Sequence, residues 1–141
     1  QQLHGHITGS AWILNKAKNA ALLTHHAKLD RWLQLGGHAD GEMDIANVAL
    51  REAQEESGLE QINLLLPTIF DIDIHSIPAR GNEPEHFHYD VRYLFSADSN
   101  VPLQKNSESK ELKWVLLTDI STLVGHTSSI TRMVEKSMTN N

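Results

Sequence analysis

One helical segment, bounded by a glycine-rich stretch and a single glycine, constrains the fold of this chain most strongly. Apolar residues recur at helical spacing over residues 45–57. Asp44 precedes this segment and is expected to cap it, because its carboxylate can accept hydrogen bonds from the free backbone N–H groups of the first turn. Gly58 follows and suits the left-handed conformation that ends many helices. Residues 36–41, rich in glycine, are predicted to form the loop that leads into the helix.

Most of the remaining chain is predicted to form strands. Residues 68–75 and 87–95 alternate polar and apolar side chains, with the period of 2 that indicates strands with one apolar face. A loop with proline and glycine joins them, so we expect an antiparallel pair. Further strands are predicted at residues 7–14, 20–24 and 112–117, and a terminal helix at 128–137. Strands before, between and after two helices predict an α/β (α+β) fold in which helices cover a central sheet.

The composition limits the classes of function. The 141 residues include 12 Lys and Arg against 18 Asp and Glu, which gives a net charge of −6 with nine His counted as neutral. This balance argues against non-specific binding to nucleic acid or anionic membranes. The absence of cysteine excludes a thiolate nucleophile and Cys-ligated zinc. No stretch approaches the roughly 18 apolar residues of a membrane span and no signal peptide is visible, so a cytoplasmic location is expected.

The length is typical of one domain, and we expect a single domain over residues 1–141. Because the chain begins with Gln rather than Met, we also expect that an N-terminal segment is missing.

Three carboxylates gather on the predicted helix. Glu52, Glu55 and Glu56 are spaced i, i+3, i+4 and therefore share one face, near the helix C-terminus, where the dipole is already negative. A hard divalent cation such as Mg²⁺ or Mn²⁺ would compensate this repulsion and would in turn bind phosphate oxygens. The preceding glycines allow close approach of the backbone and can offer a carbonyl to the ion. A solvated acidic face, which most Glu-rich helices have, is the simpler alternative.

The stretch from Gly37 to Leu59 resembles the Nudix box, G-x5-E-x7-R-E-U-x-E-E-x-G-U, in which U is aliphatic. The matching residues are Gly37, Arg51, Glu52, Glu55, Glu56, Gly58 and Leu59, with Ala53 at the first U. One position departs, because Met43 stands where the box has its first Glu. In the family that Glu braces the box, often through the Arg, and the flanking Glu42 and Asp44 are both candidates for the role.

The resemblance implies a Nudix-like α/β/α sandwich with a mixed sheet and a Mg²⁺-dependent hydrolase (with Mn²⁺ as the alternative ion). Such enzymes act as pyrophosphatases that cleave a nucleoside diphosphate linked to another moiety. The implied metal ligands are Glu52, Glu55, Glu56 and the Gly37 carbonyl. The implied catalytic residues are Glu52, Glu55 and Arg51, with Arg51 orienting the carboxylates.

The general base is left open by the resemblance. Glu52 is one candidate. Other family members place the base on a later loop, where Glu108 and Glu111 are the candidates in this chain, although exposed loop carboxylates are the simpler interpretation of both.

Four residues outside the helix are candidates for contact with substrate. His38 lies beside the expected phosphates, and Arg80 lies in the loop between the alternating strands. His88 and Asp90 belong to the polar face of those strands, which must either be open to solvent or line a cleft. We expect that part of this face, including Asp73, lines the substrate pocket. An exposed face with surface ion pairs is the alternative.

Two functions remain in competition. The first is the hydrolase, acting on a small nucleotide-type substrate whose identity the sequence leaves open. The second is a non-catalytic Nudix-fold domain that binds a ligand or regulates, which the Met43 departure favours and the intact glutamate set disfavours. A homodimer is compatible with either function, whereas a histidine-based metal protein lacks matching ligand spacing.

Overall fold

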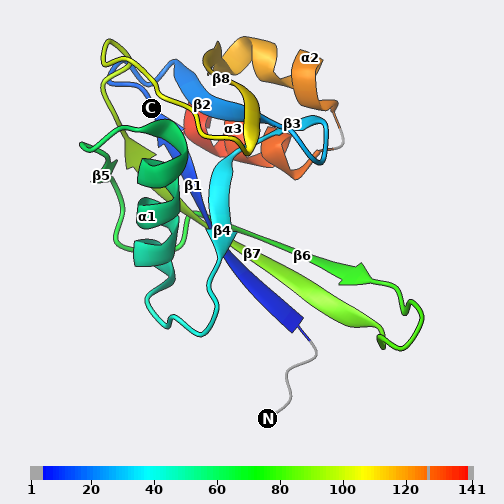
Figure 1. The fold of residues 1–141 in the computed structure, drawn as a ribbon. Coiled ribbons are helices and arrows are strands. Elements are labelled where there is room, and N and C mark those ends of the chain that lie inside the picture. The colour runs from blue at the N-terminus through cyan, green and yellow to red at the C-terminus, as the bar shows by residue number, and fades with distance from the viewer. Residues whose placement is uncertain (1–4, 127, 140–141) are drawn as a thin grey trace.

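Eight strands form one mixed β-sheet in the computed structural model, which describes residues 5–126 and 128–139 (Figure 1). The strands are β1 (Gly5–Leu14), β2 (Ala20–His26), β3 (Arg31–Leu33), β4 (Leu35–His38), β5 (Asn63–Leu64), β6 (Asp71–Ile77), β7 (His86–Ser96) and β8 (Ser109–Leu116). The helices are α1 (Ile45–Ser57), the short 3₁₀ turn η1 (Leu117–Asp119), α2 (Ile120–Val124) and α3 (Ser129–Thr139).

The long strand β1 lies at the centre of the sheet. It runs parallel to β7 along its whole length and antiparallel to β2 and β4. On one side β2 continues the sheet to β3 and β8, and on the other side β7 pairs with β5 and β6. The antiparallel pairing of β6 with β7 confirms the hairpin predicted from the two alternating segments.

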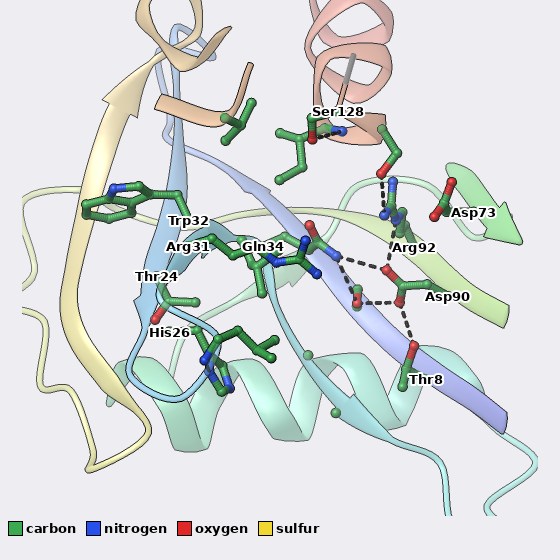
Figure 2. Close-up of a pocket in the computed structure, with 18 of the residues that line it drawn as sticks. Thr8, Thr24, His26, Arg31, Trp32, Gln34, Asp73, Asp90, Arg92 and Ser128 are labelled. Carbon is green, nitrogen blue, oxygen red and sulfur yellow. Dashed lines mark hydrogen bonds and ion pairs between the residues drawn. The ribbon is translucent and has the colours of Figure 1, made fainter. Parts of the chain in front are cut away.

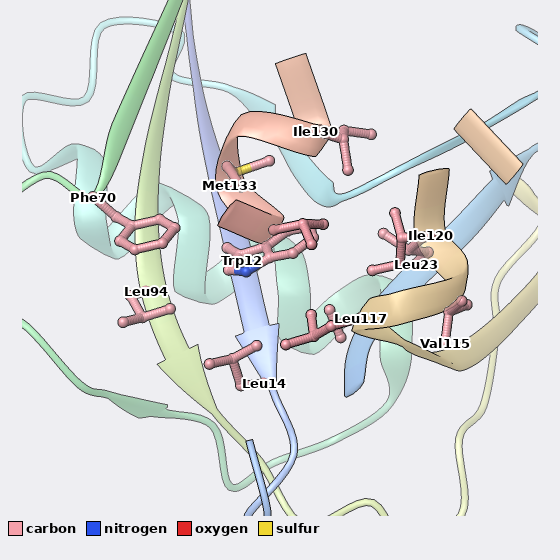
Figure 3. Packing of buried hydrophobic residues seen from close by; sticks show 12 residues of the cluster. Trp12, Leu14, Leu23, Phe70, Leu94, Val115, Leu117, Ile120, Ile130 and Met133 are labelled. Carbon is pink, nitrogen blue, oxygen red and sulfur yellow. The ribbon is translucent and has the colours of Figure 1, made fainter. Parts of the chain in front are cut away.

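Alternation along β1 divides the interior into two cores. Ala11 and Ile13 face α1, whereas Trp12 and Leu14 face the helices that follow β8. Figure 3 shows the second core, in which Trp12 packs among side chains from α3 and the β8–α2 segment. Helices therefore cover both faces of a mixed sheet, which confirms the predicted fold class.

Both predicted ends of α1 are confirmed. The Asp44 carboxylate accepts a hydrogen bond from the backbone N–H of Asn47 at 3.1 Å, and Gly58 adopts the left-handed conformation at φ 77°. Among the helices of the described residues, none combines the length and the apolar character that crossing a bilayer requires.

Three details differ from the sequence prediction. Residues 36–38 belong to β4 rather than to a loop, because Gly36 and Gly37 pair with Ser10 and Gly9 of β1. A third short helix, α2, follows β8. Finally, β6 begins at Asp71 rather than near residue 68, and its apolar residues Ile72 and Ile74 are exposed whereas Asp71 is buried.

Candidate active site

A large cavity, of about 1210 Å³, lies between the sheet, the C-terminal half of α1 and the segment from α2 to the beginning of α3. The sheet contributes side chains from β1, β2, β3, β4, β6 and β7, α1 contributes two glutamates, and the region from α2 to α3 closes the opposite side. The residues that line it therefore come from segments that are far apart in the sequence.

Glycines in β4 bring the backbone against the glutamates of α1. The N–H of Gly36 donates a hydrogen bond to Oε1 of Glu56 at 3.3 Å. A Cβ added at Gly37 would lie 2.5 Å from both Cδ and Oε1 of Glu52. Any side chain at residue 37 would therefore collide with the Glu52 carboxylate as it stands, and the missing Cβ is what allows strand and carboxylate to touch.

The glutamates stand in an unfavourable environment for negative charge. Glu56 is only 7% exposed, and its burial raises the pKa of its carboxyl to about 8, even though the Gly36 N–H acts to lower it. Burial also raises the pKa of Glu52, and the neighbouring charge of Glu55 raises it further. A site that disfavours its own carboxylates to this extent gains free energy from a bound cation.

Of the other residues predicted to act in catalysis, only some line the cavity. Glu55 is exposed and does not line the cavity, although its charge acts on the other two glutamates. Glu108 does line the cavity, and its charge raises the pKa of both Glu52 and Glu56. Glu111 lies on β8 outside the lining. Within the described residues, no ion pair or hydrogen bond joins the Arg51 side chain to a carboxylate.

Residues 42–44, which surround the position of the first Glu of the box, are all exposed. Met43 is 94% exposed. Asp44 is engaged as the N-cap of α1. Glu42 is exposed, and in the part of the chain that the structure describes no side-chain contact joins it to Arg51. Among the described residues, neither candidate for the brace, Glu42 or Asp44, therefore contacts Arg51 through its side chain.

Whether these residues suit a divalent cation depends on their donor chemistry. Glu52 and Glu56 offer carboxylate oxygens on one wall of the cavity, beside the backbone of Gly36 and Gly37. Across the described residues, no three His, Asp or Glu side chains are grouped closely enough to hold an ion by themselves. Mg²⁺ is commonly held by one or two carboxylates, with water and substrate phosphates completing its shell. The donor set therefore fits Mg²⁺ or Mn²⁺ rather than an ion that needs a full protein cage.

Asp90 is the centre of a polar network on the floor of the cavity. Its Oδ1 accepts hydrogen bonds from the hydroxyls of Thr8 (2.8 Å) and Ser10 (2.6 Å), and its Oδ2 accepts from Gln34 Nε2 (2.9 Å) and Arg92 Nε (3.0 Å). Figure 2 shows Thr8, Gln34 and Arg92 converging on this carboxylate. Four donors use the acceptor capacity of a carboxylate. Asp90 lines the cavity, and its direct contact with a substrate stays a prediction.

Histidines gather at the edge of the same cavity. His38, His75 and His88 line it, and the ring centroid of His88 lies 5.1 Å from that of His75 and 6.4 Å from that of His38. Nδ1 of His88 is buried and has no hydrogen-bond partner among the described residues. Burial lowers the pKa of His88, and the proximity of His75 lowers it further. Both effects disfavour the protonated form of His88.

Arg80 does not reach the cavity. It is exposed in the turn between β6 and β7, where its backbone pairs with that of Glu83. The lining instead contains two arginines that sequence reasoning missed, Arg31 and Arg132. Arg132 donates hydrogen bonds to Asp71 across 61 residues of sequence, a distance over which no local pattern operates.

Comparison with known proteins gives one family and many related folds. A family model described as NUDIX domain matches residues 6–135. The fold is similar to that of a C. elegans Ap4A hydrolase in a binary complex (19% identity, TM-score 0.75, 96% of each chain covered). It is also similar to the MutT protein from Methanosarcina mazei Go1 (17% identity, TM-score 0.70, 100% of this chain and 98% of the other). A third similar structure is the E. coli dihydroneopterin triphosphate pyrophosphohydrolase (13% identity, TM-score 0.75, 96% of each chain). A search of curated proteins finds no match.

Proposed function

Because this chain belongs to the NUDIX domain family, we propose that it is a divalent-metal-dependent hydrolase of diphosphate (phosphoanhydride) bonds. Its substrate is a nucleoside diphosphate linked to another moiety, and Mg²⁺ or Mn²⁺ is its cofactor. Similar folds include proteins named as an Ap4A hydrolase and a dihydroneopterin triphosphate pyrophosphohydrolase, whose named substrates contain linked phosphates.

The observation that carries this proposal is the pair of glutamates on the cavity wall. Burial raises the pKa of the Glu56 carboxyl to about 8. In a pocket that only bound an uncharged ligand, this carboxyl would lower the stability of the fold with no benefit to binding. Glu56 nevertheless faces a cavity large enough for a nucleotide, beside Glu52 and against the backbone of β4. A cation site accounts for both the burial and the position of these carboxylates.

Each residue then has a role in the reaction. Glu52 and Glu56 hold the metal ion, with Glu55 beside them and with the Gly37 carbonyl as a further ligand. When bound, a divalent cation neutralises charge on the diphosphate and acidifies water. Glu52 or Glu108 accepts the proton of the attacking water at a carboxylate oxygen, since both line the cavity. His38 and His88 lie where they can contact the substrate.

A substrate panel tests this function. The purified chain is incubated with nucleoside triphosphates, dinucleoside polyphosphates, nucleotide sugars and non-nucleoside diphosphates, in Mg²⁺, in Mn²⁺ or in EDTA, and the products are separated by chromatography. We expect hydrolysis of at least one class, loss of hydrolysis in EDTA, and a fall in kcat/KM of about 100-fold or more for Glu56→Gln, because a bound metal supplies several kcal/mol of transition-state stabilisation.

The matched control is Glu135→Gln, which makes the same change at an exposed glutamate of α3. This variant should retain wild-type activity. If no class is hydrolysed while nucleotides still bind tightly, the non-catalytic ligand-binding domain becomes the better description, an alternative that the missing brace at Met43 favours.

A further inference from the structure

Five large apolar side chains are exposed together on one face of the β6–β7 hairpin and the adjoining end of β1. These residues, here called the hairpin patch, are Ile7, Ile72, Ile74, Phe87 and Tyr89, and each is between 36% and 56% exposed. Figure 1 shows the hairpin and the start of β1 extending away from the helices. The patch therefore lies on a projecting part of the molecule.

Strand register makes the hairpin patch continuous. Tyr89 is paired with Ile74 on one side and with Ile7 on the other, so these three residues form a row across the sheet. Ile72 and Phe87 lie two residues from this row on either side, and the rings of Phe87 and Tyr89 are 6.3 Å apart. Neighbours at such positions form one surface rather than scattered exposed side chains.

The same sheet face is covered only in part. Gly9 packs closely against Ile45 at the beginning of α1, and beyond that point β1 continues to Ile7 without a helix above it. The opposite face of the hairpin carries Asp73, His75 and His88, which line the cavity. The apolar face thus points away from the candidate active site and can be covered without blocking it.

We propose that the hairpin patch is the interface of a symmetric homodimer. Charge favours a second copy of this chain over a basic partner, because no charged residue of β1, β6 or β7 lies on this face, in a chain whose net charge is −6. A basic partner would need acidic side chains at the contact. Two acidic copies repel least where the contact is uncharged.

Geometry also suits a second copy. Related by a two-fold axis, the two patches would pack as facing sheets about 10 Å apart, each sheet supplying the apolar face that the other needs. At their exposed fractions the five side chains offer on the order of 400 Å² of apolar surface. This is enough for the apolar core of a standard interface of about 800 Å² per partner, with polar surroundings as its rim.

Sedimentation equilibrium over about a hundredfold range of concentration tests the proposal. The wild-type chain is expected to reach twice its 15.8 kDa mass. The substitution Ile74→Lys is expected to weaken dimerisation at least about 30-fold, because it places two like charges in the interface. Ile72→Lys provides a second variant with the same expectation, and far-UV circular dichroism confirms that both variants fold.

Leu116→Lys is the matched control, since Leu116 is also an apolar strand residue about half exposed but lies on β8. It should dimerise as the wild type does. A wild-type chain that stays monomeric at the highest concentration would overturn the proposal and leave the patch to another partner. Dimers that survive both patch substitutions would equally overturn it, because they would use another surface.

Discussion

At the scale of single residues, Glu56 shows a conflict between stability and the proposed activity. Its side chain is buried beside Glu52 and within the field of Glu108, and it receives one hydrogen bond from Gly36. In the absence of metal, deprotonation of Glu56 therefore costs free energy in the folded state that it does not cost in the unfolded chain. Residues that serve a site often lower the stability of the fold that carries them.

The substitution Glu56→Gln should therefore stabilise the metal-free protein. Gln keeps an oxygen that can accept from Gly36 and removes the charge, so at pH 7 in EDTA we expect a gain on the order of 1–3 kcal/mol in the free energy of unfolding. Urea denaturation measures it. Saturating Mg²⁺ should reverse the order by stabilising the wild type alone. A variant less stable than the wild type in EDTA would contradict this account of Glu56.

At the scale of elements, the two glycines of β4 should respond differently to alanine. At Gly36 a Cβ would lie 2.6 Å from the carbonyl oxygen of Gly9 and 2.8 Å from Cα of Ser10, so backbone must move. We expect Gly36→Ala to lower the free energy of unfolding by about 1–3 kcal/mol. At Gly37 the three atoms nearest to the added Cβ all belong to the flexible Glu52 side chain. Gly37→Ala should thus leave stability nearly unchanged and lower kcat.

Thermal unfolding and steady-state kinetics on the same preparations separate these two effects. Equal losses of stability for both variants would show that Gly37 serves strand pairing and not the placement of Glu52.

The elements also show how far sequence reasoning reached. The ends of α1 were predictable because Asp44 and Gly58 act through local backbone chemistry. The β6–β7 pair was predictable because alternation is a local pattern. The network at Asp90 was not, since its donors come from β1, β7 and the β3–β4 connection and meet only in the folded chain. The exposure of Ile72 and Ile74 on β6 was not predictable either, because alternation shows which residues share a face but not whether that face is covered.

At the scale of the whole molecule, two buried carboxyl groups, Asp71 and Glu56, change the free energy of unfolding in opposite directions as the pH rises. Asp71 ties the sheet to α3, because it accepts hydrogen bonds from Arg92, Arg132 and Lys136 at 2.6–3.1 Å. Burial raises the pKa of Asp71, but the hydrogen bonds from Arg132 and Lys136 lower it more, so the pKa lies below its usual value of 3.8. Burial of Glu56 without such partners raises the pKa of its carboxyl to about 8.

The metal-free protein should consequently be most stable in mildly acidic solution. The contribution of Asp71 is present above its unfolded pKa of about 3.9 and is lost as the pH falls below it. The contribution of Glu56 has the opposite sign, because stability is lost as the pH rises from its unfolded value of 4.5 through about 8. Urea denaturation in EDTA from pH 3 to pH 9 should therefore give a maximum in the free energy of unfolding near pH 4–5, by the same linkage.

Two variants test this assignment. Glu56→Gln should flatten the alkaline limb of the profile. Asp71→Asn should flatten the acidic limb. It should also cost about 3 kcal/mol at pH 7, because it removes one of the two carboxylates that pair with the buried Arg92 and the carboxylate that pairs with Arg132 and Lys136. If the free energy of unfolding of the wild type instead rose steadily from pH 5 to pH 8, burial of the Glu56 carboxyl would not destabilise the metal-free fold, and this account of Glu56 would be wrong.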